Sequence, residues 1–167
     1  MHIRSETASD HDAIRTIHIA AFADHPFSRH TEHLIVDALR EAGALAISLV
    51  ADVDGDVIGH IAFSPVLLNG AVCGMQALGP VGVLPRLQRR GVGSGLVAAG
   101  LTALRENGAS ACVLVGDPAF YGRFGFTSSH ALTMEGVPPD VFLSLRLSGE
   151  VARGVVTHHE AFSVGAH

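Results

Sequence analysis

The sequence predicts an α/β fold around one mixed sheet, in which an antiparallel meander is extended by a parallel crossover and flanked by helices. Two tight-turn signals, Asp54-Gly55 and Asn69-Gly70, separate three apolar stretches, a pattern typical of hairpins. Later, a glycine-rich loop leads into helical periodicity and then into the short apolar segment 111–115. A strand, a helix and a second strand in succession place the two strands parallel in one sheet.

The N-terminal quarter of the chain predicts a strand and two helices. Residues 1–9 can start a strand on Ile3, and Asp10 is expected to be the N-cap of the helix that follows. A second helix is expected from Ser28 or Thr31 to Glu41. The first helix repeats its apolar positions at helical spacing, at Ile14, Ile17, His18, Ala21 and Phe22.

The meander strands are expected at residues 45–53, 57–68 and 71–84. The third of these contains Gly79 and Gly82, which fit a bulge or the close approach of a ligand to the backbone. A kinked core strand explains the same two glycines without a ligand.

The second half predicts a helix, a short buried strand and a series of shorter elements. The helix follows the glycine-rich loop and ends at Asn107-Gly108. Asp117-Pro118 is expected to open a short helix that reaches Tyr121. Strands are expected at 124–128 and 141–147, and residues 155–162 form a final strand or a docked tail. The longer helix would bury Leu96, Val97, Gly100, Leu101 and Leu104.

Composition indicates one globular domain over residues 1–167, with its core at about 1–149 and a terminal strand or docked tail at 150–167. Hydrophobic residues make up 48% and charged residues 16%, which excludes disorder as the main state. The net charge of −5 gives no indication of nucleic-acid binding. No leader-like apolar region or membrane-length apolar run is present, so we expect a cytoplasmic protein without membrane contact.

Cysteine and histidine patterns predict neither a disulfide nor a metal site. Cys73 and Cys112 lie far apart in apolar stretches, where buried free thiols are expected. The eleven histidines are scattered. His30 and His33 could share a helix face, but two ligands do not make a site.

The glycine-rich loop from Gln88 to Gly95 carries the clearest chemistry. A turn between a strand and a helix exposes unpaired backbone N–H groups, and the helix dipole favours an anion there. Arg89 and Arg90 add charge-assisted contacts, so a diphosphate is the natural ligand. The alternative is a tight structural turn whose arginines are simply solvated.

The loop does not match the common nucleotide motifs. It lacks the Gly-Lys-Ser/Thr ending of a Walker A loop. Gly91 and Gly93 fit the dinucleotide fingerprint, but its third glycine position is Leu96. Hairpin-linked strands before the loop also argue against a Rossmann-type enzyme, which needs a βαβ start.

Two segments resemble signatures of the GNAT superfamily of N-acetyltransferases. Val83 to Leu96 contains the Q/R-x-x-G-x-G/A core at Gln88, Gly91 and Gly93. Phe120 to Phe126 resembles the later Y-x-x-x-G-F signature. The resemblance implies a GNAT-like fold and direct transfer of an acetyl group from acetyl-CoA to a primary amine, with no covalent enzyme intermediate and no metal.

The resemblance also assigns roles to residues. The strand before the loop would pair its backbone with the pantetheine arm, splay from residues 111–115 and offer an N–H to the thioester carbonyl. Tyr121 would protonate the leaving thiolate, although a core position beside its phenylalanine neighbours is the structural alternative. The cofactor-binding residues implied are Val81, Gly82, Val83, Gln88, Arg89, Arg90, Gly91, Val92, Gly93 and Ser94.

The general base is left open. Many relatives carry a glutamate on the strand before the loop, but no glutamate lies between Gln76 and Leu84. Asp117 could serve, but capping the helix at Pro118 is the favoured role for it. The other candidates are Glu32, His33, His60 and a chain of water molecules.

The partner implied is a small-molecule or peptide amine, with residues 24–27 on its side of the site by analogy with the family. The segment from Gly116 to Tyr121 resembles a small bacterial subgroup of uncharacterised GNAT proteins. A homodimer is common in the family. The alternatives are a non-catalytic acyl-CoA sensor module, a longer acyl chain, or an alcohol acceptor.

Overall fold

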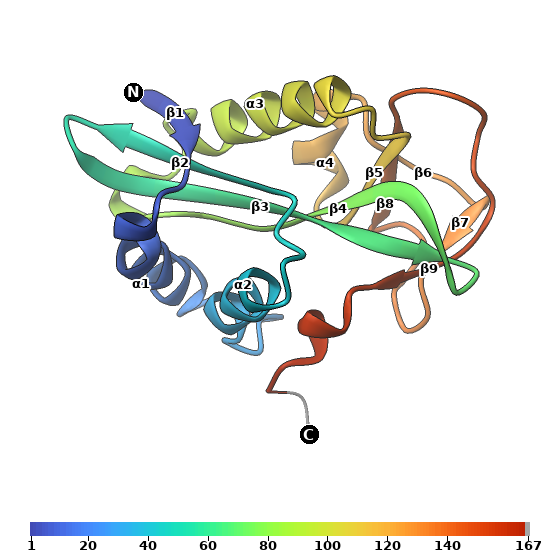
Figure 1. Ribbon diagram of the computed structural model, residues 1–167, viewed down its shortest axis with the longest axis horizontal. Helices are drawn as coiled ribbons and strands as arrows, with labels where there is room; N and C mark the ends of the chain where they lie inside the picture. Colours follow the sequence, from blue (N-terminus) through green and yellow to red (C-terminus); the bar gives the residue numbers. More distant parts are fainter. Residues whose placement is uncertain (166–167) are drawn as a thin grey trace.

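The fold is organised around a mixed sheet with strand order β1-β2-β3-β4-β5-β8-β6 in a computed structural model (Figure 1). The structure describes residues 1–165, so Ala166 and His167, the end of the expected tail, lie outside the described residues. The strands on this path are β1 His2–Ser5, β2 Ile47–Val53, β3 Asp56–Leu68, β4 Ala71–Val83, β5 Ala111–Val115, β8 Phe142–Arg146 and β6 Thr127–Ser128.

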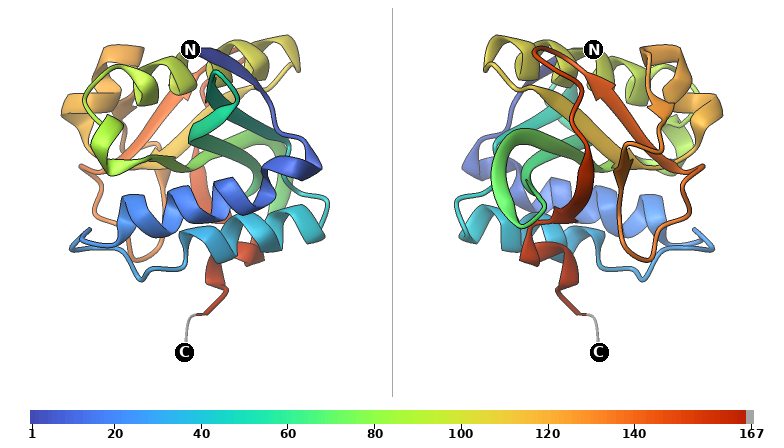
Figure 2. Two further views of the ribbon diagram at one scale, coloured as in Figure 1. Left: turned by 90° about the vertical axis from the view of Figure 1, so that its left-hand side faces the viewer. Right: turned by 90° about the vertical axis from the view of Figure 1, so that its right-hand side faces the viewer.

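Helices cover both faces of this sheet. The helix α3 lies across one face, and α1 and α2 lie side by side on the other (Figures 1 and 2). Each helix turns an apolar stripe to the strands, as amphipathic periodicity requires. The helices are α1 His11–Phe22, α2 Glu32–Glu41, α3 Val92–Glu106 and the single turn α4 Pro118–Tyr121. This order and layering confirm the predicted α/β fold with a mixed sheet.

The predicted meander is confirmed, together with both of its tight turns. The strands β1 to β4 pair antiparallel in succession. Asp54 and Gly55 have φ values of 51° and 90°, and Asn69 and Gly70 have 52° and 81°. Positive φ at both central residues identifies type I′ turns, whose twist matches that of the flanking strands. This antiparallel start excludes the Rossmann alternative.

The strand β4 carries the predicted irregularity at its glycines. Its register with β3 shifts between Leu78 and Val81, so β4 has an extra residue there. Gly79 takes a φ of 143°, a value that favours glycine, and its peptide bond to Pro80 is cis. The bulge expected in this strand is therefore confirmed at Gly79.

The strands β4 and β5 are parallel but remain paired over a short stretch only. Their register is Gln76 with Cys112 and Ala77 with Val113. Beyond these pairs β4 continues to Val83 along β3 alone, so its other edge is open. The sheet is therefore forked in its middle, which is the splay that the family resemblance implies.

The last third of the chain departs from prediction in one element. Residues 124–128 were expected to form a strand, but a 3-10 helix occupies Gly122–Phe124 and only Thr127–Ser128 pairs, with β8. Gly125 causes the break, because its φ of 95° turns the chain between the two. The expected strand at 141–147 is confirmed as β8.

The C-terminal segment extends the sheet away from the fork. The strand β9, Gly154–His158, pairs antiparallel with the last residues of β3 and parallel with β7, Leu132–Thr133. A 3-10 helix at Glu160–Ser163 then packs Ala161 and Phe162 against α2.

The expected N-cap position of Asp10 is confirmed, and one of the two cysteines differs from expectation. Asp10 stands at the N-cap position of α1, but its carboxylate makes no capping bond there. It is buried and instead accepts from the backbone N–H of Thr7 and from Arg4. Cys112 is buried as expected, whereas Cys73 is only half-buried. Within residues 1–165, no helix is long and apolar enough to cross a membrane.

Candidate active site

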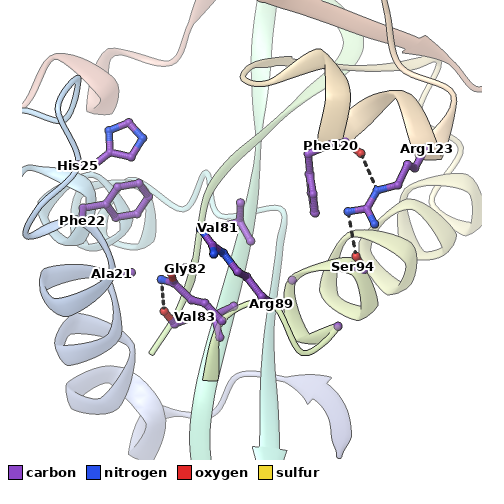
Figure 3. A pocket seen from close by; sticks show the side chains of 13 residues that line it. Ala21, Phe22, His25, Val81, Gly82, Val83, Arg89, Ser94, Phe120 and Arg123 are labelled. Atoms are coloured by element: carbon purple, nitrogen blue, oxygen red, sulfur yellow. Dashed lines mark hydrogen bonds between the residues drawn. The ribbon is translucent and has the colours of Figure 1, made fainter. Parts of the chain in front are cut away.

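A cleft of about 630 Å³ opens where β4 leaves β5 (Figure 3). The end of α1 forms one wall, the segment around Phe120 and Arg123 forms the opposite wall, and the last residues of β4 lie between them. The glycine-rich loop closes one end. The lining residues are Ala21, Phe22, His25, Val81, Gly82, Val83, Gln88, Arg89, Gly91, Gly93, Ser94, Phe120 and Arg123.

The glycine-rich loop has the geometry of an anion site. Gly91 is the N-cap of α3, with a φ of 86°, and no side chain caps the helix. The first N–H that bonds back to Gly91 is that of Gly95, so the three N–H groups between them have no partner inside the helix. Arg89 also takes a left-handed φ, 64°. Positive φ at alternate residues curls backbone N–H groups into a cup for an anion.

Two arginines bring positive charge to this end of the cleft. Arg89 lines it directly. Arg123 reaches across from the other wall, with its guanidinium 4.5 Å from the centre of the Phe120 ring and 3.5 Å from Ser94 Oγ. The stacking and the hydrogen bond to the Phe120 carbonyl hold the guanidinium in place over the loop. A diphosphate would therefore meet both N–H donors and cations.

The open edge of β4 offers free backbone groups to an extended ligand. The N–H of Leu84 donates to the Ile58 carbonyl, so this pair is hydrogen-bonded across the two strands. In an antiparallel ladder such pairs alternate, which turns the backbone of Val83 and Val81 away from β3 and toward the fork. The Val83 carbonyl already accepts from the Gln88 side chain at 3.0 Å.

The structure brings together most of the cofactor-binding residues that the sequence predicts. Two of them stand apart. Arg90 is exposed and does not line the cleft. The side chain of Val92 is buried beneath the strand, near Gly59, so only its backbone can contribute.

Tyr121 lies behind the cleft wall rather than among its lining residues. Its ring lies against Gly116, the residue after β5, and meets the rings of Phe120 and Phe126 edge-on, with centres 4.8 and 5.9 Å away. Burial raises the pKa of its hydroxyl to about 12, and charges at Cys112 and Asp117 add to the rise. Tyr121 therefore keeps its proton at neutral pH.

The candidate bases have different surroundings. Asp117 accepts from the N–H of Ala119 at 2.9 Å and caps α4, as predicted. Glu32 accepts from the Ser28 hydroxyl, and it lines with His33 a smaller cavity of about 340 Å³ between α1 and α2. His60 is fully buried and bonds to His18.

His18, Phe22 and Arg123 are site residues to which sequence analysis gave no functional role. His18 was assigned to the apolar face of α1, and a histidine among aliphatic residues was the available signal. Phe22 shared that face. Within residues 1–165, no three histidine, cysteine, aspartate or glutamate side chains are grouped closely enough to hold a metal ion.

Comparison with known proteins gives consistent matches. The model of the acetyltransferase (GNAT) domain family matches residues 2–128. YhbS of Escherichia coli K12, named an uncharacterized N-acetyltransferase, is 37% identical over 152 residues, covering 87% of this chain and 91% of YhbS. A GNAT family acetyltransferase from Brucella melitensis, solved in complex with acetyl-CoA, has a TM-score of 0.87 and 46% identity over 96% of this chain and 97% of its own. The structure of E. coli YhbS in complex with CoA has a TM-score of 0.84 and 35% identity, with coverages of 99% and 93%.

Proposed function

Because the chain belongs to the GNAT family of N-acetyltransferases, we propose that it moves an acetyl group from acetyl-CoA directly to a primary amine of a small molecule or peptide. It is an acetyl-CoA-dependent acyltransferase, which decides against the non-catalytic sensor module. The observation that carries the proposal is one cleft that joins a diphosphate site at the N-terminus of α3 to the open edge of β4.

In this proposal the loop and the open strand hold acetyl-CoA in two parts. The unpaired N–H groups at the start of α3, with Arg89 and Arg123, bind its diphosphate. The backbone of Val81 and Val83 pairs with the amide-containing arm, as an added strand would. An N–H on this edge polarises the thioester carbonyl, and acetyl-CoA itself supplies the activated acetyl group.

Tyr121 is proposed as the general acid. Its ring contacts Gly116 at the end of β5, and Cys112, whose charge affects its pKa, pairs with β4 at the base of the fork. A hydroxyl that stays protonated can donate to a thiolate as negative charge develops on sulfur.

The acceptor amine is proposed to enter from the side of α1 and α2. The smaller cavity there contains Glu32 and, among its lining residues, neither lysine nor arginine. A carboxylate in the lining of a cavity favours a positively charged ammonium group. A cytoplasmic location, a homodimer and a single acetyltransferase domain over residues 1–167 are proposed as well.

Calorimetric titration of acetyl-CoA tests the cofactor site. The Gly91→Glu, Gly93→Glu double variant places negative charge in the anion cup, so we expect it to lose the saturable binding of the wild type. The control is Gly108→Glu, which adds one carboxylate at another glycine of positive φ in open space, beyond the far end of α3, and it is matched to the single variant Gly91→Glu. Gly108→Glu should bind like wild type. Absence of binding by folded wild-type protein, or binding by the double variant, would contradict the proposed site.

A further inference from the structure

A line of hydrogen-bonded side chains runs from the wall of the cleft to the N-terminal segment. His18 on α1 and His60 on β3 are 1% and 0% exposed, and His18 Nε2 lies 2.7 Å from His60 Nδ1. His60 Nε2 lies 2.7 Å from Ser48 Oγ on β2. The Ser48 hydroxyl in turn donates to the carboxylate of Glu6. The helix α1, the hairpin β2–β3 and the segment after β1 therefore meet in one polar line.

The Glu6 carboxylate determines which atom donates and which accepts in every hydrogen bond of this line. Burial works to raise the pKa of Glu6, but hydrogen bonds from Arg40 and Ser48 outweigh it and lower the pKa, so Glu6 is ionised and only accepts. The Ser48 hydroxyl donates its only proton to Glu6, so the Ser48 oxygen accepts the hydrogen bond from His60 Nε2–H. His60 Nδ1 then accepts from His18 Nε2–H, which leaves a lone pair on His18 Nδ1.

That lone pair points at the backbone of Gly82, a residue that lines the cleft. His18 Nδ1 is buried and has no hydrogen-bond partner among the described residues. A methyl group placed on Gly82 would lie 2.8 Å from it, so Nδ1 is directed at the backbone of β4 next to the open edge. His18 also lines the smaller cavity with Phe22 and Glu32, and Phe22 borders both cavities. The His18 ring thus borders the smaller cavity, and its Nδ1 lies against the backbone of β4 at a residue of the cleft.

We infer that His18 is the general base, accepting on Nδ1 the proton that the acceptor amine loses. His60, Ser48 and Glu6 are positioning residues that hold the tautomer. The inference rests on the proposed function and assigns the base that the missing strand glutamate leaves open.

The proton step balances as a simple transfer. Once the ammonium has lost one proton to water, the lone pair of the neutral amine nitrogen forms the bond to the acetyl carbon. The carbon–sulfur bond breaks, its electron pair leaves on the CoA thiolate, and the thiolate takes a proton from Tyr121, which water then reprotonates. The second N–H bond breaks, its electron pair stays on nitrogen, and the proton joins Nδ1. His18 becomes an imidazolium whose Nε2–H points along the line toward the Glu6 carboxylate, as in other histidine bases oriented by an acid. The proton leaves to water when the product departs.

The charges around the line keep His18 neutral before the reaction. Burial lowers the pKa of His18 well below its usual range, and positive charge at His60 or His33 would lower it further. Burial also lowers the pKa of His60, with Arg40 adding to the effect and Asp10 opposing it. His11 meets Glu6 at 2.9 Å on the outer side. The His18 ring is therefore neutral at pH 7.

Nitrogen-15 NMR of the wild-type protein at pH 7 tests the tautomer without any substrate. We expect His18 to show an unprotonated Nδ1 and a protonated Nε2. In Ser48→Ala the link from His60 to the Glu6 carboxylate is lost, so nothing fixes which histidine nitrogen donates. The population of this His18 tautomer should therefore fall. A protonated Nδ1 in the wild type would overturn the inference.

Acetyl transfer to a panel of primary amines, followed by release of the CoA thiol, tests the chemistry. His18→Gln should lower kcat by about 10²- to 10⁴-fold, the usual range for a general base, while acetyl-CoA affinity by calorimetry stays unchanged. Ser48→Ala should cause a smaller loss. The control is His158→Gln, because His158 is another histidine with a buried, unpartnered Nδ1, but it stacks on Phe162 away from the cleft.

The outcomes separate this inference from the proposed function. Full activity of His18→Gln, with wild type active, overturns the assigned base and leaves the acetyltransferase intact. Failure of wild type to bind acetyl-CoA overturns the proposed function instead. If His18→Gln does not fold, two other measurements test the inference. A protonated Nδ1 of His18 in the wild type rejects it, and so does a Ser48→Ala variant that is as active as His158→Gln.

Discussion

At the scale of single residues, the packing around Tyr121 determines the protonation state of its hydroxyl. Gly116 has no side chain, and a methyl group there would lie only 2.6 Å from the tyrosine ring. The ring can therefore press against the end of β5, where burial raises the pKa of its hydroxyl to about 12. The chain contains this one tyrosine, so its removal gives a clean test.

Tyr121→Phe keeps the ring and removes the proton. If the hydroxyl protonates the leaving thiolate, kcat should fall by about 10²-fold or more, with acetyl-CoA affinity unchanged. Thiol release with an amine of the panel measures this. Phe124→Leu is the matched control, since it repacks the same aromatic group outside the cleft lining and should retain activity. Equal kcat in Tyr121→Phe and wild type would show that the tyrosine only packs.

The residue scale also shows where sequence reasoning succeeds. The conformation of the glycine-rich loop was predictable because its glycines are neighbours in the chain, whereas Arg123 reaches the same end of the cleft from a distant segment. The bond between His18 and His60 joins residues 42 positions apart. It depends on how α1 packs on β3, and nothing in the local sequence of either histidine specifies the other.

At the scale of elements, the contact of α3 with the sheet depends on a missing side chain. A methyl group on Gly100 would meet two ring atoms of Phe63, which is fully buried in β3. The predicted apolar face of α3 placed Gly100 correctly, although periodicity cannot reveal which large residue fills its space. Similarly, Gly125 and the 3-10 turn before it broke a strand that apolar content alone had predicted.

Gly100→Ala should overpack this contact and lower the free energy of unfolding by about 1–3 kcal/mol, despite the better helix propensity of alanine. Urea unfolding of the free protein measures the change. Gly93→Ala is the control within the same helix, because its nearest atom, on Val83, is 3.9 Å from the added methyl group. A stability equal to that of Gly93→Ala would mean that Phe63 moves aside without cost.

At the scale of the whole molecule, Arg4 fastens the N-terminal strand to two other parts of the fold. Its guanidinium bonds to Asp10 at 2.8 Å, before α1, and to Asp52 at 3.2 Å, on β2. The hydrogen bond from Arg4, with those from Thr7, lowers the pKa of Asp10 from its ordinary 3.8 to about 2. Because the pKa is lowered on folding, ionised Asp10 stabilises the fold above pH 4, and this stabilisation is lost as the pH falls toward 2.

Asp10→Asn should therefore lower the free energy of unfolding by about 1–2 kcal/mol at pH 7, a value that allows for solvent screening. The difference in this free energy between the variant and the wild type should shrink near pH 2. Urea unfolding of both proteins across this range gives the comparison. Asp140→Asn, at an exposed position, is expected to follow wild type at every pH. A constant difference between Asp10→Asn and wild type would indicate a packing effect and not a titrating carboxylate.

The fold as a whole was the most predictable level, because tight turns and the crossover leave few ways to connect one sheet. The sequence patterns do not predict over how many residues β4 and β5 pair. The fork between them follows from a bulge at Gly79 and from a β5 that is only five residues long. The position of β9 also depends on contacts with the distant β3.

The outer strands of the sheet have a consequence for how copies of the protein can meet. The strand β1 has four residues, and β6 and β7 have two each. Edges this short expose too few unpaired N–H and C=O groups to template a further strand, which protects against aggregation through the backbone. The open backbone of β4 at the fork lies inside the sheet, between β4 and β5, and not at its outer edges.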